Sequence, residues 1–427
     1  MKPERRNTPG GARALPKPAR LVLAAGLACV MCWLAWASLR VAASRFAAEH
    51  ALRTRAPHEA ELAARLAPGD ADAHFARAWL LSNAGDAEGA RLAYVRALEL
   101  RPRDHVLWLE SGKLLERAGD TQGALDALGL AAQLAPHYAQ PRWQLGHALL
   151  RAGRTEDALA ELRRAAASDP LLYPNMLQAA WHSTGEDAAA FVRAASPVAD
   201  AEKLAVVGFL VRAGESRAGL RLLRESGATL SAEARRRLVA ELLAAEDFAG
   251  AYEVWAEGRE GARRGAFADG GFEGEARTDE EGFGWRFASG ARGLRLSLDA
   301  ESPREGARSL LVEYAGASEP AERAVSQLLP VEPGARYRLT FAARTKSLVT
   351  GGPPVVEVVA ASKTGAALAS TAALPNATDG WRDFALEFVA PTTGAVRLSL
   401  RREPCATSPC PAFGQLWLDA FELRRLG

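Results

Sequence analysis

The hydrophobic pattern divides the 427-residue chain into three stretches. Residues 21–39 contain no charged side chain, and residues 57–262 repeat apolar positions at the spacing of amphipathic helices. Residues 267–427 alternate apolar and polar positions in short runs that are separated by Gly, Pro and Asn. These periods predict a multi-domain protein with one apolar helix, an all-α repeat domain and an all-β sandwich of roughly eight to ten strands.

The uncharged stretch at residues 21–39 has the length of a membrane span. As a helix it would extend about 28 Å, close to the hydrocarbon core of a bilayer at about 30 Å. The leader, residues 1–20, carries six basic side chains and one acidic side chain, while only Arg40 and Arg45 follow the span directly. The positive-inside rule places the leader in the cytoplasm and the body outside it. We therefore expect a single-pass protein of the bacterial inner (cytoplasmic) membrane with a periplasmic, extracytoplasmic body.

A cleaved signal peptide is the alternative to this anchor. Residues 35–37 and 41–43 resemble the small-residue motifs at which signal peptides are cut. The apolar stretch is longer than the usual core of a signal peptide, which favours a signal anchor that stays in place. The body is exported in both cases.

Residues 71–104, 105–138 and 139–172 align at a period of 34 residues without a gap. This pattern resembles the tetratricopeptide repeat (TPR), in which small residues let two antiparallel helices approach closely. Glycine ends the first helix of each repeat, and proline stops the second. The aligned positions of the three repeats are Ala78, Gly112 and Gly146; Gly85, Gly119 and Gly153; Ala90, Ala124 and Ala158; Ala97, Ala131 and Ala165; and Pro102, Pro136 and Pro170.

The resemblance implies a helical solenoid over residues 57–262 whose degenerate outer repeats act as caps. It also implies a protein-binding groove on the concave face, lined by the first helix of each repeat. The alternative is that the aromatic residues of this face pack against the helix next to the anchor or against the C-terminal domain. Carried onto this chain, the groove positions are Phe75, Trp79, Leu109, Lys113, Trp143 and His147.

The strand runs of residues 267–427 follow a recognisable order. The segments DGGFE at 269–273, VEPGARYRLTF at 331–341 and LWLDAFEL at 416–423 are similar to jelly-roll carbohydrate-binding modules of the type appended to xylanases and glucanases. The resemblance is more specific for the jelly-roll fold than for sugar binding. Alternation along three strands assigns these residues to the core: Tyr337, Leu339 and Phe341; Phe384, Leu386 and Phe388; Val396, Leu398 and Leu400.

Sugar binding would require aromatic rings that are open to solvent. The residues that remain for stacking are Phe283, Trp285, Trp381 and Phe413, with core or edge packing as the alternative. The resemblance further implies that Glu273 and Asp419 help to hold a structural calcium ion, which would make the melting temperature sensitive to a chelator. No other cofactor is expected.

The cysteines fall into two pairs. Cys405 and Cys410 flank four residues of a Pro-rich loop, and in an oxidising compartment they can close a small disulfide, with free thiols as the alternative. No other Cys or His is near enough in the sequence to complete a zinc site there. Cys29 and Cys32 lie in the apolar stretch, where packing is the expected role.

Charge and histidine usage exclude several functions. The net charge is +8 over residues 1–55, −4 over residues 56–267 and −2 over residues 268–427, so the folded body lacks the positive charge of a nucleic-acid-binding protein. All seven histidines lie between His50 and His182. A His-dependent triad or zinc site is therefore excluded from the C-terminal half.

These features predict a non-catalytic membrane-anchored scaffold. Its repeats would bind proteins and its sandwich a polysaccharide, in envelope or exopolysaccharide assembly. A scaffold that binds only proteins is one alternative, and a glycosidase is another, with Asp383 and Glu387 as carboxylates on one strand face. Arginines on neighbouring strands would pair with these carboxylates, and the acidic run at residues 279–281 is expected to be a solvated loop. We find no phosphate-binding Gly loop and no Gly-x-Ser-x-Gly motif.

Overall fold

The computed structural model describes residues 17–274, 280, 282–287, 293–316, 319–320, 322–363 and 365–427. The chain divides into two compact units, Met1–Ala195 and Ser196–Gly427. In its described residues the first unit is helical, while the second combines helices α11–α14 with a β-sandwich. This confirms the predicted fold class.

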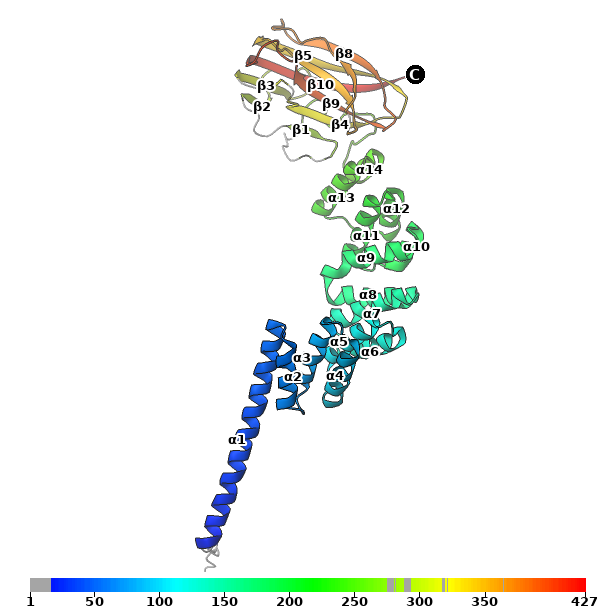
Figure 1. The fold of residues 1–427 in the computed structure, drawn as a ribbon. Helices are drawn as coiled ribbons and strands as arrows, with labels where there is room; N and C mark the ends of the chain where they lie inside the picture. Colours follow the sequence, from blue (N-terminus) through cyan, green and yellow to red (C-terminus); the bar gives the residue numbers. More distant parts are fainter. Residues whose placement is uncertain are drawn as a thin grey trace, which may run out of the picture. The chain divides into compact units, whose positions relative to one another are not determined.

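Helix α1 (Lys17–Thr54) contains the predicted span and continues beyond it (Figure 1). It is long and apolar enough to cross a membrane over Ala19–Thr54, although a signal sequence near the N-terminus meets the same description. Its last turns pack on α2 (Pro57–Leu66): buried Ser44 donates a hydrogen bond of 2.8 Å to the carbonyl of Ala63. The end of α1 and α2 therefore form an additional helix pair before the first in-register repeat.

The other helices of the first unit follow the repeat order. Each first helix ends at a glycine in the left-handed region, with φ of 86° at Gly85, 83° at Gly119 and 75° at Gly153. The helix pairs are α3 (Ala71–Asn83) with α4 (Ala87–Leu100), α5 (His105–Arg117) with α6 (Thr121–Leu134), α7 (Ala139–Arg151) with α8 (Thr155–Ser168), and, after the 3₁₀ turn η1 (Pro170–Leu172), α9 (Tyr173–Ser183) with α10 (Ala188–Ala195).

The small residues of the repeat pattern lie where two helices cross. A β-carbon added to Gly112 would come within 2.7 Å of Cγ of Leu128, and one added to Gly146 would come equally close to Cγ of Leu162. The six alanines at the two aligned positions of the second helices are also buried. The structure therefore confirms that small side chains set the close approach within each pair.

Replacing Gly112 by alanine is expected to destabilise the helical unit by about 1–3 kcal/mol, because the new methyl group overlaps Leu128. Gly129→Ala is the matched control, since Gly129 is helical and its β-carbon would meet open space. The control should stabilise α6 by about 0.5–1 kcal/mol. Thermal melting followed by circular dichroism compares the two variants. Equal melting temperatures would contradict the close packing of α5 on α6.

The helices of the second unit correspond to the degenerate outer repeats that follow residue 172 in the sequence. Their bounds are α11 (Asp200–Arg212), α12 (Ser216–Ser226), α13 (Ala232–Ala244) and α14 (Phe248–Ala256), and they pair as α11 with α12 and α13 with α14. Gly214 forms the turn of the first pair with φ of 86°, and Ala251 is fully buried in the second. Two degenerate helix pairs therefore lie in the same compact unit as the sandwich.

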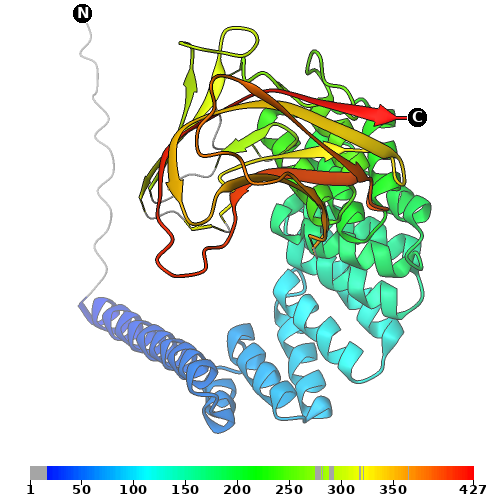
Figure 2. The same ribbon diagram turned by 90° about the horizontal axis from the view of Figure 1, so that it is seen from above.

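In its described residues, the sandwich consists of two five-stranded antiparallel sheets, drawn in yellow-green to red in Figure 2. Sheet A has the order β1 (Trp285–Phe287), β4 (Val325–Pro330), β9 (Ala395–Arg402), β6 (Pro354–Ala360), β7 (Ala367–Ser370). Sheet B has the order β2 (Leu294–Asp299), β3 (Ser309–Gly316), β10 (Ala412–Leu426), β5 (Arg336–Thr350), β8 (Arg382–Val389).

The core between the sheets contains all nine residues that alternation assigns to it, with Phe384 partly buried and the others buried. The opposite faces belong to different sheets. Arg397 and Arg401 lie on sheet A, whereas Asp383 and Glu387 lie on sheet B. Because alternation distinguishes inside from outside but not one sheet from the other, the sequence could not separate these two polar faces.

Candidate functional site

Two of the predicted groove residues lie in contact with each other on α7. Trp143 and His147, one turn apart, make an edge-to-face pair with ring centroids 4.8 Å apart, and both are half-buried. Burial lowers the pKa of His147, and Arg151 lowers it further while Glu116 opposes the shift. His147 is therefore neutral at pH 7, with one donor and one acceptor nitrogen for a partner.

Polar contacts join the first helices of successive repeats. Arg151 of α7 donates to Oε1 of Glu116 on α5 from Nε at 2.8 Å, and Arg117 of α5 donates to Oγ of Ser82 on α3 at 2.6 Å. Lys113 is half-buried and pairs with Glu110 at 2.8 Å. Next to the Trp143 and His147 pair, this face is charged, which suits a polar segment of a partner protein.

Three predicted groove residues are engaged elsewhere. Leu109 is 7 % exposed and packs with Leu125 and Leu128 of α6, so its assignment to the groove is wrong. Trp79 packs against the alanine-rich cluster of α1, α2 and α3, as the alternative interpretation expected. Phe75 lies with its ring centroid 6.3 Å from that of Tyr94 on α4. Phe75 and Trp79 are half-buried, like Trp143, so their assignment to the groove stays a prediction.

Helix α14 packs directly on sheet A, and Phe283 lies in that contact. Its ring centroid is 5.0 Å from Tyr252 and 5.7 Å from Trp255, both on α14. The same cluster includes Leu328 of β4 and Ala395 of β9. Phe283 is 1 % exposed, so no sugar ring can stack on it and its assignment to a glycan site is wrong.

Glu280 ties the loop before β1 to this helix. Its Oε1 accepts hydrogen bonds from Nε1 of Trp255 at 2.8 Å and from the backbone N–H of Gly282 at 2.9 Å. Glu280 is therefore a structural contact and not the solvated loop residue that we expected. Its neighbours Asp279 and Glu281 lie outside the described residues.

Trp285 belongs to the core. It is 6 % exposed, its ring lies 4.7 Å from that of Phe272, and its Nε1 donates to the carbonyl of Asp269 at 2.7 Å. Within β1 the neighbouring Arg286 takes the outward position. The assignment of Trp285 to a glycan site is therefore also wrong.

The outer face of sheet B contains a cavity of about 640 Å³. The guanidinium of Arg344 lies in it, 4.1 Å from the ring centroid of Trp417 and 5.7 Å from that of Trp381. Nε1 of Trp417 donates to Asp299 at 2.6 Å, and Nε1 of Trp381 donates to the carbonyl of Ser302 at 3.2 Å. Both indole rings are thus held in place with Arg344 next to them.

The rest of this cavity offers groups that can bind a ligand. Lys346 on β5 and Gln415 on β10 are cross-strand neighbours that line it. Phe413 lies two residues from Gln415 on the same strand face and is 50 % exposed. Polar groups therefore lie beside one open aromatic ring, an arrangement that suits a hydroxyl-rich ligand.

Trp417 and Arg344 were not among the predicted site residues. A signal for Trp417 was present, because it alternates with the core residues Leu416 and Leu418 and must point outward. Arg344 had no such signal. Its importance depends on β5 pairing with β10, which brings it opposite Trp417.

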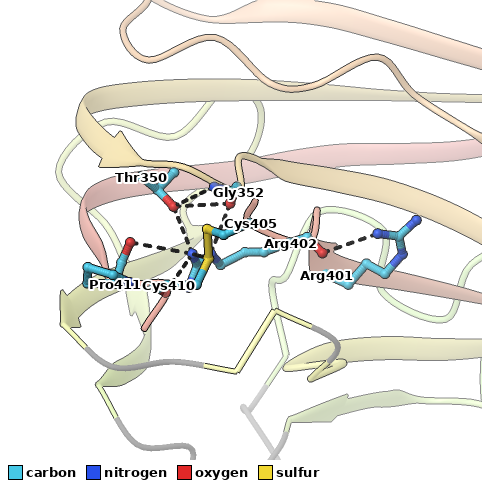
Figure 3. Close-up of a disulfide and its surroundings, with 7 residues drawn as sticks. All are labelled: Thr350, Gly352, Arg401, Arg402, Cys405, Cys410 and Pro411. Atoms are coloured by element: carbon cyan, nitrogen blue, oxygen red, sulfur yellow. Dashed lines mark hydrogen bonds between the residues drawn. A yellow bond between two sulfur atoms is a disulfide. The ribbon is translucent and has the colours of Figure 1, made fainter. Parts of the chain in front are cut away.

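Cys405 and Cys410 form the predicted disulfide, with their Cα atoms 5.7 Å apart (Figure 3). Buried Arg402 holds the same loop: its Nη2 donates to Oγ1 of Thr350 at 2.7 Å and to the carbonyl of Cys410 at 2.9 Å. Burial lowers the pKa of Arg402, but arginine remains charged because its ordinary pKa is so high. The disulfide and the guanidinium together fix the loop before β10.

The carboxylates of Glu273 and Asp419 are held by backbone N–H groups. Asp419 accepts hydrogen bonds from residues 304–305 at 2.8 and 3.2 Å, and Glu273 accepts them from residues 307–308 at 2.8 and 3.2 Å. Burial raises the pKa of Asp419, the backbone hydrogen bonds oppose this, and Glu273 raises it further. A carboxylate has about four lone-pair sites, so these hydrogen bonds fix both side chains but leave acceptor capacity. The calcium site stays a prediction, which the chelator sensitivity of the melting temperature would test.

The two carboxylates considered for glycoside hydrolysis are exposed and paired. Asp383 lies 3.5 Å from Nη2 of Arg304, and Glu387 lies 3.4 Å from Nη2 of Arg336. Pairing with arginine is as expected, although the partners differ from the arginines of sheet A. Neither carboxyl group has the apolar surroundings that keep a general acid protonated near neutral pH.

Comparison with known proteins identifies the helical region. One tetratricopeptide repeat family model matches residues 71–104, and a second matches residues 115–180. The chain contains tetratricopeptide repeats. The first match covers α3 and α4, and the second runs from the end of α5 through α8 into α9, so residues 105–114 lie between the two matches.

No curated protein matches the chain. A solved structure of PilF from Pseudomonas aeruginosa is 17% identical, with 45% of this chain and 95% of that chain covered and a TM-score of 0.34. A structure of MamA from Desulfovibrio magneticus RS-1 is 19% identical, with 44% and 92% covered and a TM-score of 0.31. A CBM4 structure is 14% identical, with 38% and 99% covered and a TM-score of 0.29.

Proposed function

We propose that this chain is a non-catalytic scaffold, anchored by α1 in a bacterial inner membrane, with a periplasmic body. The TPR region binds a protein partner, and the outer face of sheet B binds a glycan. The basic leader before residues 21–39 supports this topology. A single anchor that presents both surfaces would serve envelope or exopolysaccharide assembly, and it requires no cofactor.

The observation that carries the proposal is the cavity on sheet B. Arg344, Lys346 and Gln415 supply hydrogen-bond donors at its surface, and the half-exposed ring of Phe413 lies on the same face. A sugar ring presents hydroxyl groups at its edge and C–H groups on its face, so it can use both kinds of contact. The ion-paired carboxylates of this sheet favour binding over hydrolysis.

A glycan array probed with the full chain in detergent tests the glycan site. We expect Lys346→Ala and Phe413→Ala each to weaken binding about tenfold, the loss of about 1.4 kcal/mol of contacts. Arg338→Ala is the control, because Arg338 is also exposed on β5 but does not line the cavity. Absence of binding to every glycan, or equal loss in the control, would contradict the glycan site.

The repeat surface is tested separately by crosslinking the full chain to its partner. Trp143→Ala should abolish the crosslinked product, whereas Leu92→Ala, on the exposed part of second helix α4, should retain it. A Trp143-dependent protein partner without any glycan ligand would identify a scaffold that binds only proteins.

A further inference from the structure

The uncharged stretch of α1 ends at Leu39, and Arg40 is the first charged residue after it. The most apolar window of 18 residues in this helix has no buried residue, and Figure 1 shows α2 beside only the C-terminal part of α1. A span of this length matches the thickness of the hydrocarbon core. With α1 as the membrane anchor, Arg40 therefore lies at the surface of the bilayer.

Helix α2 brings the repeat unit back to the level of Arg40. The guanidinium donates to the carbonyl of Leu66, the last residue of α2, from Nε at 3.1 Å and from Nη2 at 2.7 Å. These bonds satisfy a carbonyl at the C-terminal end of the helix, where carbonyls lack partners within the helix itself. The turn between α2 and α3 is therefore held at the level of the lipid headgroups.

A cavity of about 390 Å³ opens at this level between α1, the α2–α3 turn and the end of α4. We call it the α1 cavity. Arg40 and Arg45 of α1 line it, together with Arg101 from the end of α4. The carboxylate in its lining is that of Asp70, which lies in the turn before α3. The lining thus contains three cations and one anion.

Two of these cations are paired with carboxylates. Nε of Arg45 donates to Asp70 at 3.1 Å, and Asp70 is 7 % exposed. Arg101 donates through both Nη atoms to Asp72, at 2.7 and 2.8 Å. Arg40 has no carboxylate partner among the described residues. The α1 cavity therefore keeps one positive charge without a counter-ion, which matches the single negative charge of a phosphate diester.

Arg40 is held in position for a ligand. Its guanidinium lies 4.5 Å from the ring centroid of Trp36, one turn earlier on α1, while the carbonyl of Leu66 binds two of its nitrogens. The side chain is half-buried, and its Nη1 has no hydrogen-bond partner among the described residues. A charged group in this setting gains free energy from a bound anion, because burial has removed part of its hydration.

The apolar part of the lining continues into the span. Ala37 and Val41 line the α1 cavity, and Leu34 precedes Ala37 by one turn on the same face of α1, with 47 % of its surface exposed. A lipid whose headgroup enters the cavity can place an acyl chain along this face. A soluble phosphate has no group that uses it, so the lining favours a lipid.

We propose that the α1 cavity binds the phosphate of an anionic phospholipid, with Arg40 and Arg45 as hydrogen-bond donors. Guanidinium groups bind phosphate oxygens through directed N–H bonds. The site rests on the proposed function in one respect, because it requires α1 to span the membrane. It uses neither the sheet B cavity nor the groove residues of the repeats. Lipid binding there would fix the orientation of the repeats relative to the membrane.

Native mass spectrometry of the full chain in detergent tests the proposal, with phosphatidylglycerol and phosphatidylcholine of the same acyl chains added separately. The wild-type chain should prefer phosphatidylglycerol, because phosphatidylcholine has no net charge. Arg40→Gln should weaken phosphatidylglycerol binding about tenfold, and Arg40→Lys should weaken it less because the charge is kept. Arg53→Gln is the control: Arg53 is exposed on α1 but does not line the cavity.

Equal affinity of the wild-type chain for both lipids would overturn the proposal, and this comparison needs no variant. Equal loss in Arg40→Gln and Arg53→Gln, or in Arg40→Gln and Arg40→Lys, would also overturn it, since the effect would then not depend on a charge in the cavity. If glycerol phosphate displaces the lipid at equal concentration, the ligand is a soluble phosphate ester and the lipid assignment fails.

Failure of the anchor and failure of this site give different results. Loss of α1 from the chain isolated from membranes, seen as a lower intact mass, would refute the anchor in the proposed function. Absence of lipid selectivity in a chain of full mass would refute the site alone.

Discussion

Replacing Phe283 by alanine is expected to lower the free energy of unfolding of the second unit by about 3–5 kcal/mol. The side chain is 1 % exposed and contacts Tyr252 and Trp255 of α14 in the cluster that also contains Leu328 and Ala395 of sheet A. Its removal leaves a cavity that neither the helix nor the sheet can fill alone. Both elements should therefore lose stability together.

Hydrogen exchange of the full chain, read by mass spectrometry, can measure this effect. We expect faster exchange in α14 and in strands β4 and β9 of the variant. Phe413→Ala provides a control with the same chemical change at a side chain that is 50 % exposed, and it should cost less than about 1 kcal/mol. Faster exchange in the strands with an unchanged α14 would show that the helix is not part of the same cooperative unit.

The Glu357→Gln variant should be destabilised by about 3 kcal/mol at pH 7, as expected when one partner of a buried ion pair is removed. Glu357 is 5 % exposed. In the variant, Arg401 and Arg323 lose the carboxylate to which both donate hydrogen bonds. The remaining amide can accept only one of these hydrogen bonds well and carries no charge. Glu387→Gln is the control, because its ion pair with Arg336 is exposed and worth at most about 1 kcal/mol.

The effect of Glu357→Gln should also depend on pH. Burial raises the pKa of Glu357, but hydrogen bonds from Arg401 and Arg323 outweigh burial and hold it below its ordinary value. The folded state thus releases this proton more readily than the unfolded state, so the ionised side chain stabilises the fold above pH about 4.5. That contribution is lost as the pH falls through the lowered pKa. Denaturant unfolding of both proteins should show their difference shrinking below pH about 4.5, and a constant difference would contradict the ion-pair explanation.

The contact of α14 with sheet A changes where the sandwich begins. Composition and period place the change from helix to strand near residue 267, but Tyr252 and Trp255 belong to the same hydrophobic cluster as Leu328. A fragment that starts at residue 267 would expose this surface of sheet A. Binding experiments on the sandwich should therefore keep α14, and those described above use the full chain.

Much of the fold could be predicted because its signals are local. The 34-residue period depends on glycines and alanines that act within one helix pair, as the contact of Gly112 with Leu128 shows. Alternation in the strands likewise depends only on the two-residue period of the backbone, so core residues such as Leu339 and Leu398 were assigned correctly.

The candidate sites were harder to predict because they depend on neighbours that are distant in the sequence. Phe283 and Trp285 resembled stacking residues by their type and loop position, yet α14 covers the first and Phe272 packs on the second. The cavity on sheet B requires β5 and β10 to pair, which places Arg344 beside Trp417.

The sequence by itself determined the anchor-like helix, the repeat register, the two-layer sandwich and the Cys405–Cys410 pair, because each follows from short-range period, spacing or composition. Only the tertiary structure decided which polar face belongs to which sheet. Strand order places Arg286 and Arg397 on sheet A and Arg344 on sheet B. The reason is physical: alternation is a property of one strand, whereas a binding surface is made by strands that pair across long stretches of chain.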